Sequence, residues 1–329
     1  MHAVRVGEFG GPEVLVPSEV PDPVAGAGQV VVEVAAADVL YLDTQIRNGR
    51  FRAYFPVRPP YVPGSAVAGT VLSVGDGVSG EWVGRVVVAR TLDGRGGYAE
   101  RAVAPVATLT VVPDGLDVPA AAALAHDGPT ALALFDGASV GPGEWVLVTN
   151  AAGGLGSVLV QLARRAGARV IGAAGKTAPV ARLGADVVVD YRRPDWTTQV
   201  RAATHGADID VVFDGVGGDI GLAAFEMTAG GGRFSAHGAP GGGFAAVDRA
   251  EAARRGVRVS GIEQVQFEPA AVPPLTERAL AEAAAGRITP LIGQTFPLAK
   301  AADAHAAIES RMSIGKTLLL PTPGAPAAR

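Results

Sequence analysis

A glycine-rich turn at residues 151–156 gives the strongest chemical signal in this sequence. It reads Ala-Ala-Gly-Gly-Leu-Gly, so it fills the last two glycine positions of the pattern G-x-G-x-x-G and has alanine in the first. Gly153 lets the backbone approach a pyrophosphate, and Gly156 lets a helix pack closely on a strand. A pyrophosphate there would meet the N–H groups and dipole of a helix N-terminus. A hydrophobic strand precedes the turn, and a helix and a second strand follow. We therefore interpret residues 146–172 as half of a dinucleotide-binding unit, not as an ordinary strand ending.

The end of the second strand indicates which nicotinamide cofactor fits. An acidic residue about 20 positions after the glycines would accept hydrogen bonds from the ribose 2′-hydroxyl of NAD. Here the strand at 169–173 is followed by Ala174, Gly175 and Lys176, with no carboxylate. A lysine can contact a 2′-phosphate, whereas an acid would repel it. The sequence thus favours NADP(H), although Lys176 could equally be a solvated loop lysine.

Composition and charge limit the classes of protein. The chain has 329 residues, 48% hydrophobic and 18% charged, which is enough for a large core and two domains. A net charge of −4 with interspersed signs argues against nucleic-acid and anionic-membrane partners. The sequence has no cysteine, which excludes disulfides and thiolate zinc sites. Because we find no signal-peptide pattern and no apolar stretch of membrane-spanning length, we expect a cytoplasmic enzyme.

The elements that must position the turn fall into two patterns. The first third contains short β-rich runs between Gly, Pro and Asp turns, at residues 2–7, 29–35, 67–75 and 85–89, typical of an irregular β-barrel. From Val118 the pattern becomes helical and then alternates, with strands expected at 144–149, 169–173, 186–190, 210–213, 233–236 and 257–261. This alternation predicts an α/β fold with a doubly wound parallel sheet. Helices at 275–285 and 298–310 and a strand at 316–320 follow, which we place with the first domain.

Several ordered motifs together carry a resemblance to a known family. They are FGGPEVL (9–15), LDTQIRNG (42–49), PYVPGSAVAGTV (60–71), GPTALALF (128–135), AAGGLGSVLVQLA (151–163), FDGVGG (213–218), FPLAKAADAHAAIES (296–310) and GKTLLLP (315–321). The chain resembles the zinc-independent quinone oxidoreductase (zeta-crystallin-like) branch of the medium-chain dehydrogenase/reductase superfamily. The resemblance implies a GroES-like barrel domain from residues 1–121 and 264–329 and a Rossmann domain from 122–263. It also implies NADPH, hydride transfer to quinones or other conjugated carbonyls, and a homodimer.

The resemblance also implies a set of cofactor contacts. Thr130 would lie near the nicotinamide or its adjacent phosphate, and Lys316 would be a further contact near the C-terminus. The pyrophosphate would be held by Ala152, Gly153, Gly154, Leu155 and Gly156. The remaining contacts would be Gly175, Lys176 and Tyr191 at the adenosine 2′-phosphate and Val216, Gly217, His237 and Gly238 at the nicotinamide ribose. Tyr191 could instead be a strand-end aromatic that covers the sheet edge.

No metal is expected. Zinc-bearing relatives place a cysteine and a histidine ligand in segments where this chain has Leu40 and Ser65. The five histidines are scattered and form no H-x-x-E-H pattern, so we interpret them as surface or packing residues. His126 and His237 are the two that lie near the expected cofactor loops.

Candidate catalytic residues lie in the segment that faces the substrate in the family. Asp43 and Arg47 are four residues apart, on one face of a short helix expected to begin near Asp38. They could stabilise or protonate the oxygen that gains charge on hydride transfer, or could be a local ion pair that braces the helix.

Aromatic residues close by provide further candidates. Tyr41, Tyr54 and Tyr61 could hydrogen-bond a carbonyl, and residues 51–55 could form an apolar substrate wall, although such aromatics are more often core residues. Leu40 and Gln45 stand where family members often have Asn and Tyr. The loss of these two polar side chains affects the prediction of the substrate more than the prediction of the reaction type.

The sequence therefore predicts an NADPH-dependent reductase of quinones or α,β-unsaturated carbonyls. Two alternatives stay open: a dedicated enoyl or keto reductase that acts on a polyketide-like intermediate, and an NADPH-binding sensor without turnover. Oxidation of a simple alcohol ranks lowest, because the sequence shows no zinc site and no S…Y-x-x-x-K relay to polarise a hydroxyl.

Overall fold

The computed structural model describes residues 1–51, 54–311 and 313–321, which form two compact units. Unit 1 contains residues 1–126, 269–286 and those from 292 onward, and unit 2 contains residues 127–268 and 287–291. Arg52 and Ala53 of the expected apolar wall lie outside the described residues. The same is true of residues 322–329 of the tail.

Unit 1 is built on a mixed, mostly antiparallel sheet. Seven strands take part, in the order β14-β15-β3-β4-β5-β7 with β6 also paired to β3. Their bounds are β3 Gln29–Val39, β4 Ala66–Val74, β5 Val86–Arg90, β6 Arg101–Pro105, β7 Thr110–Val111, β14 Ile292–Pro297 and β15 Lys316–Leu320. A separate hairpin joins β1 (His2–Val6) to β2 (Leu15–Glu19). The C-terminal β15 pairs antiparallel with β3, with Leu318 opposite Asp38, so both ends of the chain contribute to one sheet.

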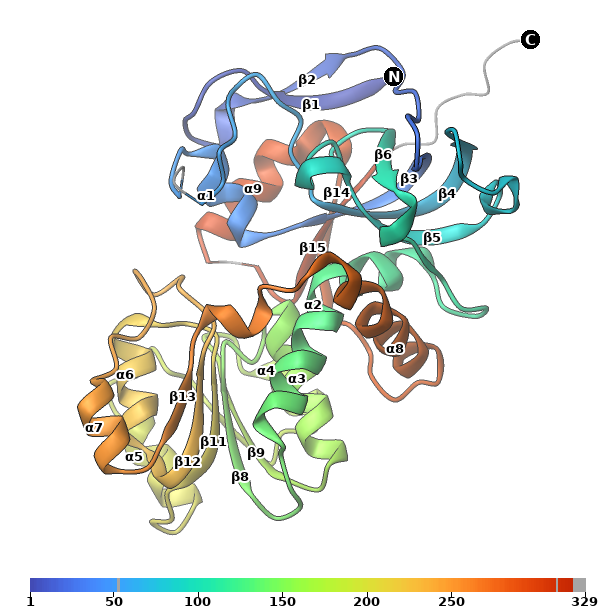
Figure 1. Ribbon diagram of the computed structural model, residues 1–329. Coiled ribbons are helices and arrows are strands. Elements are labelled where there is room, and N and C mark those ends of the chain that lie inside the picture. The colour runs from blue at the N-terminus through green and yellow to red at the C-terminus, as the bar shows by residue number, and fades with distance from the viewer. Residues whose placement is uncertain (52–53, 312, 322–329) are drawn as a thin grey trace. The chain divides into compact units, whose positions relative to one another are not determined.

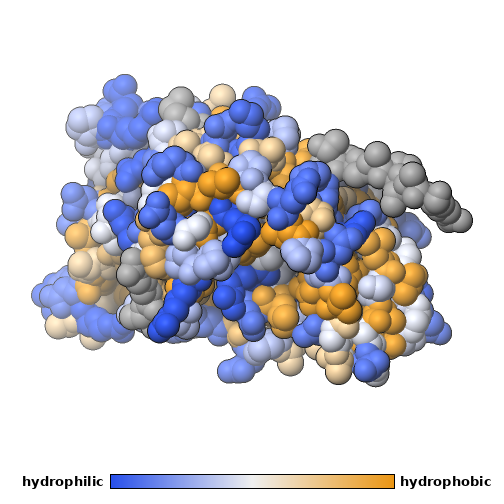
Figure 2. Space-filling view, turned by 90° about the horizontal axis from the view of Figure 1, so that it is seen from above, coloured by the Kyte–Doolittle hydropathy of each residue, from blue (hydrophilic) through white to orange (hydrophobic). Residues whose placement is uncertain are grey.

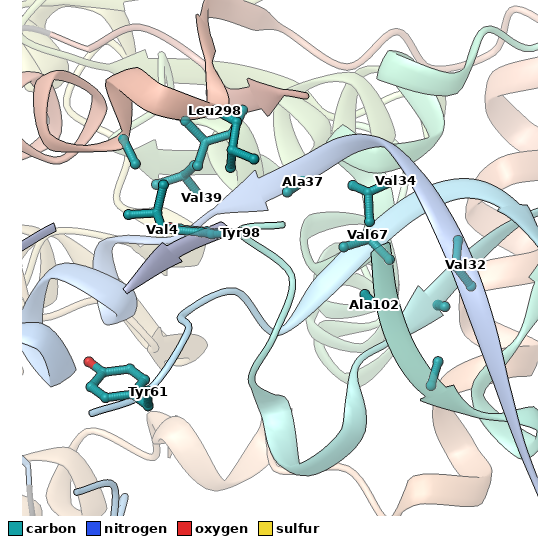
Figure 3. Packing of buried hydrophobic residues seen from close by; sticks show 14 of the residues in the cluster. Val4, Val32, Val34, Ala37, Val39, Tyr61, Val67, Tyr98, Ala102 and Leu298 are labelled. Carbon is teal, nitrogen blue, oxygen red and sulfur yellow. The ribbon is translucent and has the colours of Figure 1, made fainter. Parts of the chain in front are cut away.

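The core of unit 1 lies against β3. Figure 3 shows Val34 of β3 facing Val67 of β4, with Val4, Val39 and Leu298 gathered farther along the strand. All of these side chains are buried. Burial of each such side chain contributes about 1.5–3 kcal/mol relative to exposure, so this cluster stabilises the contact between strands from distant parts of the chain.

Helix α1 (Tyr41–Arg47) begins three residues later than predicted. We expected a start near Asp38, but β3 continues through Val39 because its apolar residues pair with both β4 and β15. Leu40 is extended (φ −98°, ψ 151°), and its N–H donates to Asp43 Oδ2 at 2.9 Å. Asp38 is therefore a buried strand residue, not a helix residue.

The local ion pair considered for Asp43 and Arg47 is wrong. The Arg47 guanidinium pairs instead with Glu309, the last residue of α9 (Ala301–Glu309). Only 1% of the Arg47 side chain is exposed, against 29% for Glu309. The ion pair thus joins α1 to a helix that lies more than 250 positions later in the chain.

Two further helices complete the connections. α2 (Val118–Ala138) runs across the point where unit 1 ends and unit 2 begins, and α8 (Val272–Ala284) belongs to unit 1. The short turn at residues 298–300 precedes α9.

Unit 2 is a six-stranded parallel sheet in the order β10-β9-β8-β11-β12-β13. This confirms the predicted doubly wound pattern. Figure 1 shows α3 on one side of the sheet and α6 and α7 on the other. The strands are β8 Trp145–Thr149, β9 Arg169–Ala173, β10 Val187–Val189, β11 Ile209–Asp214, β12 Thr228–Ala236 and β13 Arg258–Ser260. The helices between them are α3 Gly154–Arg165, α4 Ala178–Arg182, α5 Trp196–Ala203, α6 Gly218–Glu226 and α7 Arg249–Arg254.

The surface mixes polar and apolar residues. Figure 2 shows hydrophobic side chains interrupted by hydrophilic ones on the face that it draws. Among the described residues, no helix has the length and apolar character needed to cross a membrane.

The buried Arg47 yields a prediction about stability. Arg47→Ala removes one partner of a largely buried pair, so we expect a loss of about 3 kcal/mol in the free energy of unfolding, measured by urea titration. The exposed pair of Arg201 and Asp208, 3.8 Å apart, provides the control, because Arg201→Ala should change stability by less than about 0.5 kcal/mol. Unchanged stability of the Arg47 variant would contradict the bracing role.

Candidate functional site

The carboxyl edge of the parallel sheet brings most of the predicted cofactor residues together. Because all six strands run the same way, the residues that follow them meet at one edge, where ligands bind in open α/β sheets. Residues 152–156 follow β8, residues 175–176 follow β9, Tyr191 follows β10, residues 216–217 follow β11, and residues 237–238 follow β12. Thr130 lies on α2 within unit 2, whereas Lys316 begins β15 of unit 1.

The turn after β8 is shaped by close backbone approaches. Asn150 adopts a left-handed conformation (φ 54°), and the Gly153 N–H donates to the Asn150 carbonyl at 2.8 Å. A Cβ on Gly156 would lie 2.2 Å from the same carbonyl oxygen, so only glycine fits there. Gly156 is therefore required by the packing of helix on strand, as the pattern predicted.

Helix α3 offers an anion-binding N-terminus. Gly153 is its N-cap and has no side chain to satisfy the N–H groups of the first turn. Those groups belong to Gly154, Leu155 and Gly156, at the start of a twelve-residue helix. Backbone donors and the helix dipole suit a pyrophosphate, so the residues present fit a dinucleotide.

The segment after β9 has a basic neighbour that the sequence analysis missed. A Cβ on Gly175 would lie 3.2 Å from Arg192 Nε, so the Arg192 side chain lies beside the Gly175–Lys176 turn. Arg192 also forms a two-pronged ion pair with Asp190, at 2.7 and 2.9 Å, which neutralises the acid at the end of β10. The position of Arg192 three residues after β10 was the available signal.

Asp214 organises the turn after β11. Its buried carboxylate accepts hydrogen bonds from Thr149 Oγ1 (2.8 Å) and from the N–H groups of Val216 and Gly217 (both 3.1 Å). Burial raises the pKa of Asp214, and these hydrogen bonds act against the increase. Thr149 in turn accepts from the Gly215 N–H at 2.9 Å, which ties the ends of β8 and β11 together.

The turns after β11 and β12 touch. A Cβ on Gly217 would lie 2.1 Å from the Gly243 carbonyl oxygen, and one on Gly238 would lie 2.1 Å from the carbonyl carbon of Gly215. His237 Nδ1 lies 3.1 Å from Ser235 Oγ, and burial lowers the pKa of His237 to about 4. His237 is therefore neutral at pH 7.

In unit 1, Asp43 is held in a buried chain of hydrogen bonds. The Tyr98 hydroxyl lies 3.0 Å from both Asp43 Oδ2 and His305 Nε2. Burial, reinforced by repulsion from Asp38, raises the pKa of Asp43 to about 7 although the Leu40 N–H and Tyr98 favour its ionised form. Asp43 is thus half protonated near neutral pH. It lines a pocket with Ile46, Val57, Tyr61, Pro63, Gly64, Gly94 and Arg95.

The four predicted catalytic residues differ in environment. Asp43 and Arg47 are buried, whereas the side chains of Tyr41 and Tyr54 are 37% and 78% exposed. Tyr61, also considered in the sequence analysis, lies with Asp43 in the pocket.

A second polar cluster contains Ser65, which the resemblance aligns with a histidine ligand of zinc-bearing relatives. Ser65 hydrogen-bonds His126, which hydrogen-bonds Asp38, and Asp38 forms a buried ion pair with Lys316. Leu40 provides no ligand at the second position. Within residues 1–51, 54–311 and 313–321 no group of three or more His, Asp or Glu residues is arranged to hold a metal ion. From the sequence, Lys316 is expected to contact the cofactor and His126 to be a surface or packing residue, and nothing connects either of them with Ser65.

The pKa of Asp43 predicts how stability depends on pH. The folded pKa of about 7 lies above the usual aspartate value of 3.8, so the protein loses stability as pH rises towards and through 7. Asp43→Asn removes this titration. Between pH 5 and 8, the free energy of unfolding of the variant should rise relative to wild type by roughly 2–3 kcal/mol, as measured by urea titration. A difference that stays constant with pH would refute the raised pKa.

Family comparisons agree with this arrangement. Residues 26–114 match the family described as alcohol dehydrogenase GroES-like domain, and residues 183–319 match the one described as zinc-binding dehydrogenase. The quinone oxidoreductase of Sus scrofa is 34% identical over 97% of this chain and 98% of the relative. A 2-haloacrylate reductase from a Burkholderia species is 32% identical over 97% of this chain and 98% of the relative.

Solved structures of quinone oxidoreductases are also similar to this chain. The Escherichia coli quinone oxidoreductase, solved with NADPH, has a TM-score of 0.88 at 26% identity, covering 98% of this chain and 100% of that one. A mycobacterial protein, also solved with NADPH, has a TM-score of 0.87 at 34% identity with the same coverage. Unit 1 contains the GroES-like fold and unit 2 the Rossmann-like parallel sheet. The chain is an oxidoreductase that belongs to the quinone oxidoreductase branch of the medium-chain dehydrogenase/reductase superfamily.

Proposed function

We propose that this protein is an NADPH-dependent reductase that transfers hydride, without a metal, to quinones or other α,β-unsaturated carbonyls. The observation that carries the proposal is the turn after β9, which contains Lys176 and no acid, and whose Gly175 lies beside Arg192, on the same sheet edge as the uncapped α3 N-terminus. That edge suits a dinucleotide with a 2′-phosphate. Two relatives solved with NADPH support the choice of cofactor. A relative named 2-haloacrylate reductase supports a conjugated substrate.

The chain's own residues would position the cofactor and manage the proton. NADPH, when bound, supplies the hydride. The first turn of α3 would hold the pyrophosphate, and the turns fixed by Asp214 and Gly238 would orient the nicotinamide ribose. Asp43, half protonated near pH 7, is the candidate proton donor for the substrate, because its carboxyl group lines a pocket.

The alternatives differ in what they need. A dedicated enoyl or keto reductase would bind NADPH at the same sheet edge but reduce a different acceptor. Leu40 and Gln45, which stand where family members often have Asn and Tyr, are the residues that would change the choice of acceptor. Gln45 is buried and accepts a hydrogen bond from Arg50 at 3.1 Å. A sensor without turnover would bind NADPH and reduce nothing.

The first functional test is oxidation of NADPH by a panel of quinones, enones and simple ketones, with chelator present. We expect chelator-insensitive turnover with a conjugated acceptor. The rate should fall as pH rises above about 7, because Asp43 then loses its proton. Tight NADPH binding without reduction of any acceptor would favour the sensor or a dedicated substrate instead.

Cofactor preference is tested at Lys176. Lys176→Ala should raise KM for NADPH about tenfold, which corresponds to about 1.4 kcal/mol, and leave KM for NADH nearly unchanged. Lys300→Ala, at an exposed lysine of unit 1, is the matched control. Equal increases for both cofactors would remove the 2′-phosphate role of Lys176.

A further inference from the structure

Three side chains of unit 2 are hydrogen-bonded in a row near the carboxyl end of β12. Gln264, on the short helix at residues 262–265, has its Nε2 3.2 Å from Ser235 Oγ. Ser235 Oγ in turn lies 3.1 Å from His237 Nδ1. Gln264 Nε2 also donates to the Gly261 carbonyl at 2.7 Å. Neither the cofactor contacts nor the proton donation proposed above uses these hydrogen bonds.

The direction of these hydrogen bonds follows from what each atom can do. An amide nitrogen only donates, and Gln264 Nε2 gives its two hydrogens to the Gly261 carbonyl and to Ser235 Oγ. Ser235 is 6% exposed, so its own hydroxyl hydrogen needs an acceptor inside the protein. In the part of the chain that the structure describes, His237 Nδ1 is the acceptor within reach. The Ser235 hydroxyl therefore donates to His237 Nδ1.

The His237 imidazole presents a hydrogen on its other nitrogen. Burial lowers the pKa of His237 to about 4, and the Ser235 backbone opposes this effect only in part, so the ring is neutral at pH 7. A neutral imidazole carries one hydrogen, and because Nδ1 is an acceptor that hydrogen is on Nε2. Among the described residues Nε2 has no hydrogen-bond partner, and His237 is half-buried. Nε2–H is thus a donor that can meet a ligand.

This donor lies at the sheet edge where the turns after β11 and β12 touch. A Cβ on Gly215, the first residue after β11, would lie 3.5 Å from His237 Nε2. A Cβ on Gly238 would lie 2.2 Å from the Gly215 carbonyl oxygen, so the two turns pack directly on each other. The imidazole edge that carries the hydrogen is therefore beside the turn at residues 215–217.

The strand order indicates which half of a dinucleotide would meet this donor. The order reverses between β8 and β11, with β9 and β10 on one side and β12 and β13 on the other. A dinucleotide binds across such a reversal, with one nucleotide over each half of the sheet. Its pyrophosphate would lie at the N-terminus of α3 and its adenosine ribose at the turn after β9. The nicotinamide half then falls at the ends of β11 and β12, beside His237.

We propose that His237 binds the cofactor by donating its Nε2–H to an oxygen of the nicotinamide half, and that Ser235 and Gln264 are positioning residues that keep the hydrogen on Nε2. The inference rests on the cofactor part of the proposed function. The acceptor is a ribose hydroxyl or the nicotinamide carbonyl, both uncharged oxygens. A neutral donor suits both redox states of the cofactor, because an imidazolium would repel the positive ring of NADP⁺.

The positioning role is tested by ¹⁵N NMR of the full chain without cofactor, with the His237 signals assigned by their loss in His237→Gln. At pH 7 the wild-type imidazole should carry its hydrogen on Nε2. Gln264→Glu should move the hydrogen to Nδ1, because a carboxylate accepts the Ser235 hydrogen and leaves Ser235 Oγ to accept from the ring. Gln266→Glu, at an exposed position two residues later, is the matched control and should change nothing. A hydrogen on Nδ1 in wild type would overturn the proposal.

The binding role is tested by calorimetry with three ligands: adenosine 2′,5′-bisphosphate, 2′-phospho-ADP-ribose and NADP⁺. His237→Asn should raise Kd for NADP⁺ about tenfold and leave Kd for the bisphosphate unchanged, because the bisphosphate lacks the nicotinamide half. His237→Gln, whose longer amide can donate from the place of Nε2, should keep most of the affinity. Gln264→Glu should weaken NADP⁺ binding as His237→Asn does. His205→Asn is the control at an exposed histidine whose left-handed backbone (φ 55°) suits asparagine.

The outcomes are distinguishable. A loss of affinity that includes 2′-phospho-ADP-ribose supports the proposal with a ribose hydroxyl as acceptor, and a loss confined to NADP⁺ supports it with the nicotinamide carbonyl. If His237→Asn binds all three ligands as wild type does, or weakens all three equally, the inference is overturned and the reductase stands. If wild type binds neither NADP⁺ nor NADPH, the cofactor part of the proposed function fails and this inference fails with it.

Discussion

The buried ion pair between Asp38 and Lys316 is the interaction on which unit 1 most depends. It joins β3 to β15, so residue 38 and residue 316 of the 329-residue chain share one charge pair inside one sheet. Removing one partner of a buried ion pair is strongly destabilising, because it leaves the other charge buried without compensation. The same carboxylate also hydrogen-bonds His126 at 2.9 Å, so the residue that joins β3 to β15 orients an imidazole as well.

Two aspartates five residues apart are held in opposite protonation states. Lys316 and His126 keep Asp38 ionised, whereas burial keeps Asp43 half protonated near pH 7 and the charge of Asp38 adds to that effect. Environments that separate the pKa values of two nearby groups commonly divide acid and base roles between them. The chain changes from strand to helix at Leu40. Asp38 therefore lies on β3 and Asp43 on α1, and the two carboxylates have different surroundings.

Local patterns predicted the parallel sheet and its glycine turn, because buried strands read as apolar runs and the turn chemistry lies within six residues. β14 was missed because Ile292–Pro297 alternates between half-buried and exposed residues and contains Gly293. The start of α1 was misplaced because pairing with two neighbouring strands extends β3. The contacts among Ser65, His126 and Asp38 were not predictable: Ser65 and His126 are 61 residues apart and Asp38 and His126 are 88 apart, and no local signal connects them.

A reaction without zinc would change what the fold must provide. A metal would polarise a substrate oxygen directly, whereas side chains must do so through proton transfer. At the position of a metal-binding histidine this chain has Ser65, a hydroxyl backed by an imidazole and a carboxylate that arrive from other elements. A neutral imidazole that carries its proton on Nδ1, towards Asp38, has its Nε2 lone pair free to accept the hydrogen of Ser65, whereas Asp43, half protonated near pH 7, can donate a proton.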